Sequence, residues 1–209
     1  VRRALEKRKK KVEFLYVWDD YDVLRKVPTN LPNQDMIKEN LRKPVFQVPD
    51  PYGCHQHYAE HFEKVFEEES TLAGIKATFV YSHKHYLKCQ YAEEIKIASE
   101  HTNEIKDILN EYRREPLADS WLPIFVFCES CNKDTITNIN WTKGYEVTYS
   151  CECGKTDTIN FRKKGLVTLR WRVDWPMRWH HNKVDFETAG KDHFAAGGSV
   201  TTGIKIQEQ

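Results

Sequence analysis

Four cysteines of the chain are spaced in a way that suits a metal ion. Cys128 and Cys131 are separated by two residues, Cys151 and Cys153 by one, and nineteen residues lie between the two pairs. Two short cysteine pairs on separate turns supply the four thiolates that zinc binds as a tetrahedron. Disulfides or buried free cysteines are the alternative. The spacing predicts a zinc site, and because four thiolates leave no open coordination position, we expect its role to be structural.

A second group of metal-binding residue types lies between residues 50 and 61. Cys54, His55 and His61, with Asp50 as an oxygen donor, could form a mixed metal site. The pattern from 56 to 70 predicts a helix, so His61 would lie on the helix and the cysteine in the turn before it. From spacing alone, a histidine-rich helix start beside a free cysteine is an equally good interpretation.

Tryptophan and arginine are concentrated near the C-terminal end. Residues 169–179 contain three of each, and Trp171, Trp175 and Trp179 recur every four residues. A helix that begins near Val173, with a proline in its first turn, would align the last two indoles along one side. Tryptophan beside arginine more often builds a rigid pocket or stacking platform than core, although core packing stays open.

Two further segments suit ligand binding. Asp19 and Asp20 follow an apolar run that predicts a buried strand, at the edge where open α/β sheets bind ligands. A loop with a helix cap explains them equally well. Near the C-terminal end, a predicted strand over 184–187 leads into Gly190-Lys191-Asp192-His193 and a small-residue helix start. This order can bring backbone against a nucleotide, but the turn lacks P-loop spacing, and such turns often hold no ligand.

The elements that must position these residues alternate along the chain. We expect helices over 1–10, 56–70, 91–114 and 204–209, and strands over 12–18, 75–81 and 166–171. Prolines between residues 28 and 51 exclude long regular structure there. The alternation indicates an α/β protein. Between the cysteine pairs, alternating residues over 135–141 and 145–149 predict a hairpin, hence a zinc ribbon inserted as an all-β unit.

Composition excludes several classes of protein. The chain has 32 Lys and Arg against 31 Asp and Glu, so bulk charge does not indicate nucleic-acid binding. Its 40% apolar residues are enough for a core and argue against disorder. No apolar run approaches the roughly 18–20 residues of a membrane helix, and the start lacks a secretory signal. We expect a soluble, cytoplasmic protein without a membrane partner. Helical patterns at both ends, with no initial methionine, suggest a piece of a longer protein.

These motifs, taken in order, resemble the class I lysyl-tRNA synthetase family. The resemblance is carried by residues 18–22 with 25–28, 50–55 with 58–61, 171–179, and 190–193 with 196–199. It covers only the family's central catalytic region, since the His-Ile-Gly-His-like segment, the Lys-Met-Ser-Lys-Ser-like loop and the anticodon-binding domain have no counterpart here. The two missing motifs hold the ATP phosphates in the family. No catalytic residue is therefore assigned in this chain, which we expect to be inactive alone.

The resemblance implies an incomplete Rossmann-like class I synthetase catalytic core of the α/β class, with the zinc ribbon inserted. Its segments are expected to be the first part of the nucleotide-binding core (1–45), a connecting region with the mixed metal site (46–120), the ribbon (121–165) and the return to the core (166–209). We expect the tryptophan–arginine segment and the Gly190 turn to form two walls of one cleft.

The implied activity is that of a lysine–tRNA ligase, which activates lysine with ATP, as its magnesium complex, and transfers it to tRNA(Lys). By resemblance, the residues that contact lysine are Asp19, Asp20, Trp171 and His193, and those that face ATP are Gly190 and Asp192. The set of Asp50, Cys54, His55 and His61 resembles the family's extra zinc site, so two zinc ions are expected. The ribbon would approach the acceptor end of the tRNA. The alternatives are a non-catalytic zinc-ribbon module that binds tRNA or another nucleic acid, and a folded relic with structural zinc only.

Overall fold

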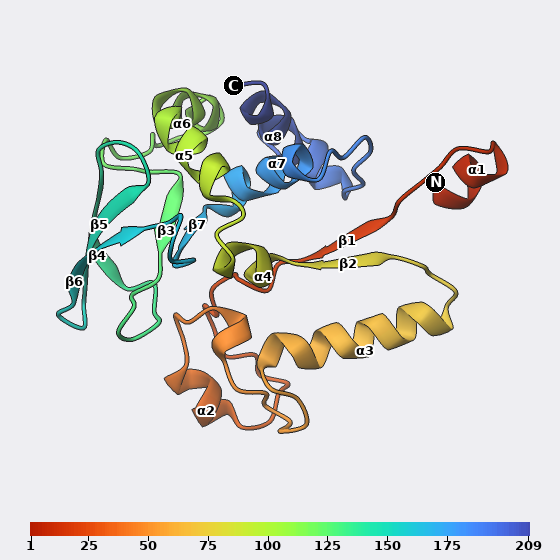
Figure 1. Ribbon diagram of the computed structural model, residues 1–209, viewed down its shortest axis with the longest axis horizontal. Helices are drawn as coiled ribbons and strands as arrows, with labels where there is room; N and C mark the ends of the chain where they lie inside the picture. Colours follow the sequence, from red (N-terminus) through yellow and green to blue (C-terminus); the bar gives the residue numbers. More distant parts are fainter. The chain divides into compact units, whose positions relative to one another are not determined.

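The computed structural model describes residues 1–209, which divide into two compact units (Figure 1). The first unit comprises residues 1–85 with 131–135, and the second comprises residues 86–130 with 136–209. Helices and strands occur in both, in agreement with the predicted α/β class. None of the helices has the length and apolar character that a bilayer span requires.

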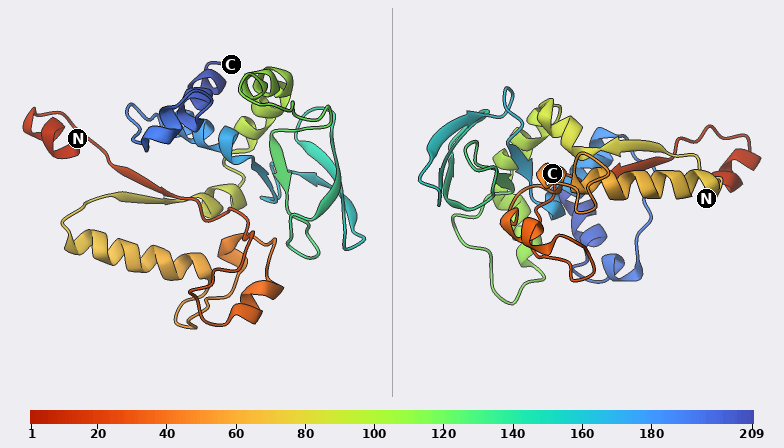
Figure 2. Two further views of the ribbon diagram at one scale, coloured as in Figure 1. Left: turned by 180° about the vertical axis from the view of Figure 1, so that it is seen from behind. Right: turned by 90° about the horizontal axis from the view of Figure 1, so that it is seen from below.

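The first unit is built on two parallel strands. They are β1 (Leu15–Trp18) and β2 (Thr78–Tyr81), and their register runs from Leu15 opposite Thr78 to Trp18 opposite Tyr81. Parallel strands need a crossover connection, and α3 (Tyr58–Leu72) lies on it. Figures 1 and 2 show α3 running along the strand pair, where the ring of Phe66 lies 5.3 Å from that of Trp18. The predicted strands over 12–18 and 75–81 and the helix over 56–70 are confirmed with shifted ends.

Short elements precede, connect and follow these strands. They are α1 (Arg2–Lys7), α2 (Gln34–Glu39), the 3-10 turn η1 (Val45–Gln47) and α4 (Ser82–Leu87). The proline-rich part of the chain forms a small core of Leu24, Leu31, Ile37 and Val48. The expected lack of long regular structure between residues 28 and 51 is confirmed.

The second unit contains the helices that follow α4 in the chain. They are α5 (Ala92–Glu100), α6 (Thr102–Asn110), α7 (Trp171–His181), the 3-10 turn η2 (Lys191–Phe194) and α8 (Ser199–Gln207). The single helix predicted over 91–114 is wrong, because α5 ends and α6 begins at His101. The Thr102 hydroxyl donates to the Ser99 carbonyl over 2.7 Å, a local bond that competes with the regular helical pattern.

Two predictions near the C-terminal end need correction. Helix α7 starts at Trp171, because the carbonyl of Arg170 already accepts from the backbone N–H groups of Val173 and Asp174. Pro176 therefore lies inside the helix and not in its first turn. The strand predicted over 184–187 is absent. The backbone N–H of Val184 instead donates to the carbonyl of Trp179 over 2.9 Å, which turns the chain back along α7.

The strands of the second unit form two antiparallel sheets. One pairs β3 (Ile124–Val126) with β7 (Val167–Leu169), which confirms a strand within 166–171. The other has the order β4 (Ile136–Trp141), β5 (Glu146–Cys151) and β6 (Thr156–Asn160). The predicted hairpin is confirmed as β4 and β5, and β6 was not predicted. Gly144 turns between them with φ +73°, a conformation that glycine adopts without steric cost.

Candidate functional site

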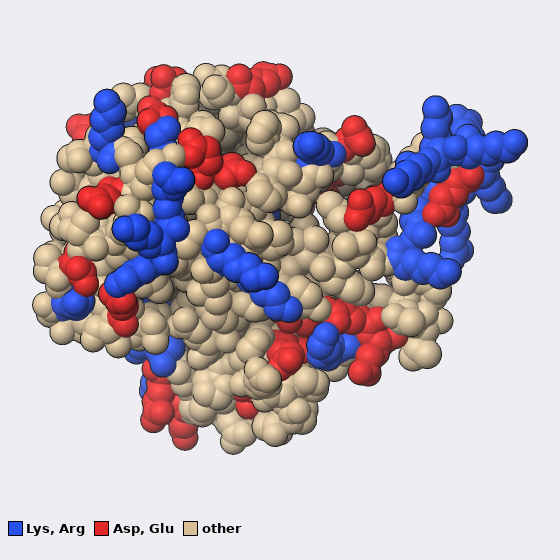
Figure 3. Space-filling model, in the orientation of Figure 1, with Lys and Arg blue, Asp and Glu red and all other residues tan.

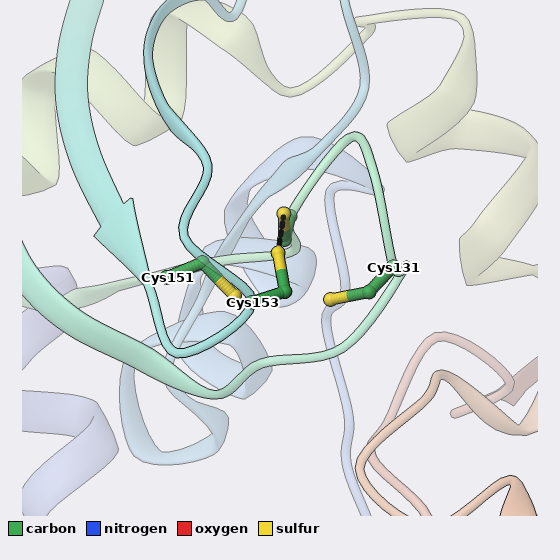
Figure 4. A group of neighbouring side chains, drawn as sticks. Cys131, Cys151 and Cys153 are labelled. Carbon is green, nitrogen blue, oxygen red and sulfur yellow. Dashed lines mark hydrogen bonds between the residues drawn. The ribbon is translucent and has the colours of Figure 1, made fainter.

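The four cysteines of the predicted zinc site lie together. Their sulfur atoms are all within 4.8 Å of one another. Figure 4 shows Cys131, Cys151 and Cys153 with their sulfurs turned toward a common centre. The sulfurs of Cys128 and Cys153 are 3.6 Å apart. Zinc–sulfur bonds of about 2.3 Å in a tetrahedron place two sulfurs about 3.8 Å apart, so the donor chemistry and spacing fit zinc.

Local backbone geometry explains why these cysteines converge. Asn132 and Gly154 adopt left-handed conformations, with φ of +58° and +88°, and each turns the chain directly after a cysteine. None of the six cysteines of the chain forms a disulfide, so the disulfide alternative is not realised. Beside the cluster, burial together with the neighbouring thiol of Cys128 raises the pKa of Tyr149 to about 12, which keeps its hydroxyl protonated.

The second predicted metal group also comes together. The ligand atoms of Asp50, Cys54, His55 and His61 lie within 4.8 Å of one another. The Cys54 sulfur is 3.2 Å from Nδ1 of each histidine and 3.3 Å from a carboxylate oxygen of Asp50. A tetrahedral ion with zinc-like bond lengths places a sulfur and a nitrogen ligand about 3.5 Å apart. This set of one thiolate, two imidazoles and one carboxylate therefore fits zinc as well.

Asp50 also organises the loop that carries its neighbours. Its carboxylate accepts backbone N–H bonds from Tyr52 at 3.0 Å and from Cys54 and His55 at 2.8 Å. Burial opposes ionisation of this group, but the three N–H donors outweigh it and hold the pKa of Asp50 below its usual value. The loop turns at Gly53, where φ is +72°. The carboxylate is thus ionised and fixed in place before any ion binds.

Asp20 lies buried at the carboxyl end of β1, and the predicted ligand residue Asp19 is exposed beside it. One oxygen of Asp20 accepts from the backbone N–H of His83 over 2.6 Å, and the other lies 2.5 Å from its Nδ1. The imidazole stacks on Phe46, with ring centroids 4.8 Å apart. Because His83 is the second residue after β2, the pair stands at the edge where both parallel strands end.

Two glutamates one turn apart on α3 reach toward the same strands. Glu67 accepts from the hydroxyl of Tyr81 at 2.6 Å and from the ammonium of Lys64 at 2.9 Å. Burial opposes ionisation of Glu67, yet these donors lower its pKa. Glu63 is buried, and burial together with the negative charges of Asp20 and Glu67 raises its pKa to about 8. At neutral pH, therefore, Glu67 is ionised and Glu63 is protonated.

The three tryptophans of α7 form a continuous column in the second unit, here called the tryptophan stack (Trp171, Trp175 and Trp179). Ring centroids are 5.5 Å apart in the first pair and 5.3 Å apart in the second. Trp171 is 39% exposed, whereas Trp179 is buried. The ring of His193 lies 6.2 Å from Trp171 and 5.4 Å from Trp175. The expected proximity of the tryptophan–arginine segment and the glycine turn is therefore observed.

The turn that carries His193 also carries the two residues predicted to face ATP. Gly190 caps η2, and its carbonyl accepts from the backbone N–H of His193 over 3.0 Å. Asp192 is exposed within the same turn. Gly198 lies so close that a Cβ added there would meet the His193 carbonyl at 2.3 Å. Glycine is thus required at position 198 for the backbone to pass this turn.

Positive side chains gather over α1 and the residues that follow it (Figure 3). The basic residues are Arg2, Arg3, Lys7, Arg8, Lys9, Lys10 and Lys11, and Glu6 is the one acidic residue among the first eleven. The chain's net charge of +1 conceals this local surplus. A concentrated positive surface attracts polyanions even where the whole molecule is almost neutral.

Comparison with known proteins identifies the family of the chain. All of residues 1–209 match the family described as tRNA synthetases class I (K). The chain belongs to this family. Curated relatives named lysine–tRNA ligase include proteins from Thermococcus kodakarensis (49% identical over all of this chain), Borreliella burgdorferi (45%, 99% of the chain) and Pyrococcus horikoshii (45%, 99% of the chain). The chain spans 39–40% of the length of these relatives.

Within this class I synthetase chain, the predicted residues fall into separate groups. Asp19, Asp20 and the mixed metal group belong to the first unit, whereas Trp171, His193, Gly190 and Asp192 belong to the second. No sequence pattern identified His83 or Glu63 as site residues. His83 had a usable signal, since it lies two residues after the predicted strand over 75–81. The roles of all these residues toward lysine and ATP stay predictions.

Proposed function

We propose that this chain forms the central catalytic region of a lysine–tRNA ligase, which activates lysine with ATP and transfers the lysyl group to tRNA(Lys). One observation carries the proposal: in a chain of the class I (K) family, the exposed indole of Trp171 lies beside the imidazole of His193. Relatives named lysine–tRNA ligase support the same substrate. We place this reaction in the cytoplasm, where tRNA is charged.

Lysine suits the tryptophan stack because its side chain has two parts. The four-carbon stem packs against an indole face, and the ammonium group is attracted to the negative face of the ring. We assign the flank of the lysine side chain to Trp171 and the closing wall of the pocket to His193. Asp19 and Asp20 supply negative potential for the substrate's ammonium groups, the second from a buried position that His83 holds.

The activation step needs lysine and ATP to be held in line. The lysine carboxylate attacks the α-phosphorus and pyrophosphate leaves; then a hydroxyl of the terminal tRNA adenosine attacks the carbonyl carbon and AMP leaves. No covalent enzyme intermediate forms, so the rate depends on positioning and charge stabilisation. We assign Gly190 and Asp192 to the adenosine of ATP, with the carboxylate accepting from a ribose hydroxyl. Magnesium accompanies the ATP phosphates, to which no residue of this chain is assigned.

We also propose two zinc ions, one in each cysteine-containing group. Cys128, Cys131, Cys151 and Cys153 would hold the first, as a closed structural site of a zinc ribbon. Asp50, Cys54, His55 and His61 would hold the second. In both sites zinc would supply cross-links between chain segments and no reaction chemistry. The ribbon would approach the acceptor end of the tRNA.

Lysine-dependent exchange of pyrophosphate into ATP tests the proposal in the natural protein that contains this chain. Exchange with lysine is expected, and Trp171→Ala should raise the KM for lysine about tenfold, equivalent to about 1.4 kcal/mol of lost contact. Trp141→Phe, a change in β4, should leave exchange unchanged. If no exchange occurs while tRNA still binds, the chain is a non-catalytic RNA-binding module. An unchanged KM in Trp171→Ala would remove this residue from the pocket.

A further inference from the structure

We propose that Glu187 is a positioning residue that fixes the orientation of the rings in the tryptophan stack. It would thereby shape the surface against which the amino-acid substrate lies. Glu187 belongs to the loop after α7, and no contact with lysine or ATP is assigned to it. The inference rests on the proposed function, because lysine is the ligand that this surface would take. Its physical basis is a shared hydrogen-bond acceptor.

One carboxylate oxygen of Glu187 accepts hydrogen bonds from two indoles of the tryptophan stack. Its Oε2 accepts from the indole N–H of Trp179 at 2.8 Å and from that of Trp175 at 3.3 Å. The other oxygen accepts from the backbone N–H of Thr188 at 3.1 Å, which fixes the carboxylate itself. An indole has a single polar atom, so its acceptor determines how the ring is turned about the side-chain bonds. A common acceptor therefore gives both rings a fixed relative orientation.

Helix α8 closes the stack from another direction. A Cβ added at Gly203 would lie 3.1 Å from two ring carbons of Trp179, a distance at which the indole has to move. The buried end of the stack is thus fixed both by the carboxylate of Glu187 and by a glycine. Burial of Trp179 makes its N–H dependent on this acceptor, because a buried donor without a partner is costly.

The exposed end of the stack depends on the buried end. Trp171 rests on Trp175 with an interplanar angle of 28°, and the ring of His193 meets Trp175 edge-on at 80°. If Trp175 rotates, both surfaces assigned to the lysine pocket lose their support. Loss of the acceptor should therefore weaken lysine binding more than it slows a reaction with bound lysine.

The test uses Glu187→Ala and Glu187→Gln in the natural protein that contains this chain, with Asp185→Asn as the control on the same exposed loop. Two measurements are made: the circular-dichroism couplet of stacked indoles, and the KM values for lysine and ATP in pyrophosphate exchange. In Glu187→Ala we expect the couplet to weaken and the KM for lysine to rise about tenfold, with kcat and the KM for ATP changed less than about twofold. Glu187→Gln keeps an acceptor oxygen, so its couplet and its KM for lysine should lie between those of the wild type and of Glu187→Ala. Asp185→Asn should match the wild type in both measurements.

Gly203→Ala supplies a second route to the same result. Alanine favours a helix interior over glycine, so this variant disturbs Trp179 without weakening α8 through backbone propensity. It should raise the KM for lysine in the same direction as Glu187→Ala, and it serves as the test if that variant fails to fold.

Specific results would overturn the inference. A weakened couplet with an unchanged KM for lysine would show that the stack is not the lysine wall, and an unchanged couplet would show that Glu187 does not position it. Equal rises in the KM values for lysine and ATP would indicate general damage and also contradict the inference. If the wild type itself shows no lysine-dependent exchange, the proposed function falls, and the couplet alone decides whether Glu187 orders the stack.

Discussion

Two glutamates one helical turn apart take opposite protonation states in this molecule. Burial, together with the negative charges of Asp20 and Glu67, raises the pKa of Glu63 to about 8. Glu67 accepts from the Tyr81 hydroxyl and the Lys64 ammonium, and these donors lower its pKa against the effect of burial. Residue type alone therefore does not determine charge here, because the partners of each side chain do.

Glu67→Gln should reduce stability in a manner that depends on pH. A carboxylate whose pKa is lowered on folding stabilises the folded state above its unfolded pKa, about 4.3, and this contribution is lost as the pH falls through the folded value. At pH 7 the variant should lose about 1.5–3 kcal/mol of unfolding free energy, the typical value of a hydrogen bond to a charged group. Urea unfolding at a series of pH values measures the difference.

The two curves for wild type and Glu67→Gln should converge below about pH 4. Glu68→Gln is the matched control, because Glu68 is exposed on the next position of the same helix and should change stability little at any pH. If the difference in unfolding free energy between the wild type and Glu67→Gln stays constant with pH, Glu67 contributes to stability through its shape and not through its charge.

At the residue scale, the sequence predicted sites made of neighbours and missed sites made of distant partners. The two metal groups are found from spacing because short turns bring their ligands together, as at Gly154 and Gly53. His83 and Asp20 lie 63 residues apart and meet only because β1 and β2 pair in parallel. Glu187 was overlooked because an acidic residue in a loop has no pattern that identifies its acceptor role.

A buried network connects Tyr86, the first residue of the second unit, with β7 and α7. The hydroxyl of Tyr86 donates to the carboxylate of Asp174 and accepts from the backbone N–H of Leu169 at 3.1 Å. The other carboxylate oxygen pairs with Arg178 at 3.0 Å, and both charged side chains are more than nine-tenths buried. Burial, and then the negative charge of Asp174, raises the pKa of Tyr86, so its hydroxyl stays a donor throughout the usual pH range.

Tyr86→Phe should lower the unfolding free energy by about 1–3 kcal/mol, because a buried N–H and a buried carboxylate oxygen each lose a partner. Asp174→Ala should cost more, about 3–5 kcal/mol, since it removes one partner of a buried ion pair. Tyr112→Phe is the control, because this hydroxyl contacts an exposed lysine. Thermal and urea unfolding measure all three, and equal effects in Tyr86→Phe and Tyr112→Phe would contradict the importance of the network.

At the element scale, periodicity located the helices and strands but not all of their breaks. The apolar pattern of 91–114 continues through the break at His101, since α5 and α6 both bury residues at helical spacing, such as Ile95 and Ile105. A run such as 184–187 has strand composition, but without a neighbouring strand it forms a loop that returns along α7. Local propensity cannot reveal whether a partner strand exists.

At the scale of the whole molecule, each metal group stands on its own backbone turns. The mixed group is held by the loop around Asp50 and the first turn of α3. The four cysteines lie in pairs on two other turns, which end at Asn132 and Gly154. The two groups share no ligand. The loss of one ion should therefore leave the other bound.

Metal analysis of the natural protein that contains this chain should find close to two zinc ions per chain. Cys153→Ser and Cys54→Ser should each reduce the content to one, because a tetrahedral site that loses a thiolate binds zinc much more weakly, and the double variant should reach zero. Cys89→Ser is the control, since Cys89 belongs to neither group and should keep both ions. Removal of zinc by a chelator should lower the melting temperature, because metal that binds only the folded state stabilises it. If Cys54→Ser retains the wild-type zinc content, the mixed site does not bind zinc, and if Cys153→Ser retains it, the ribbon assignment fails.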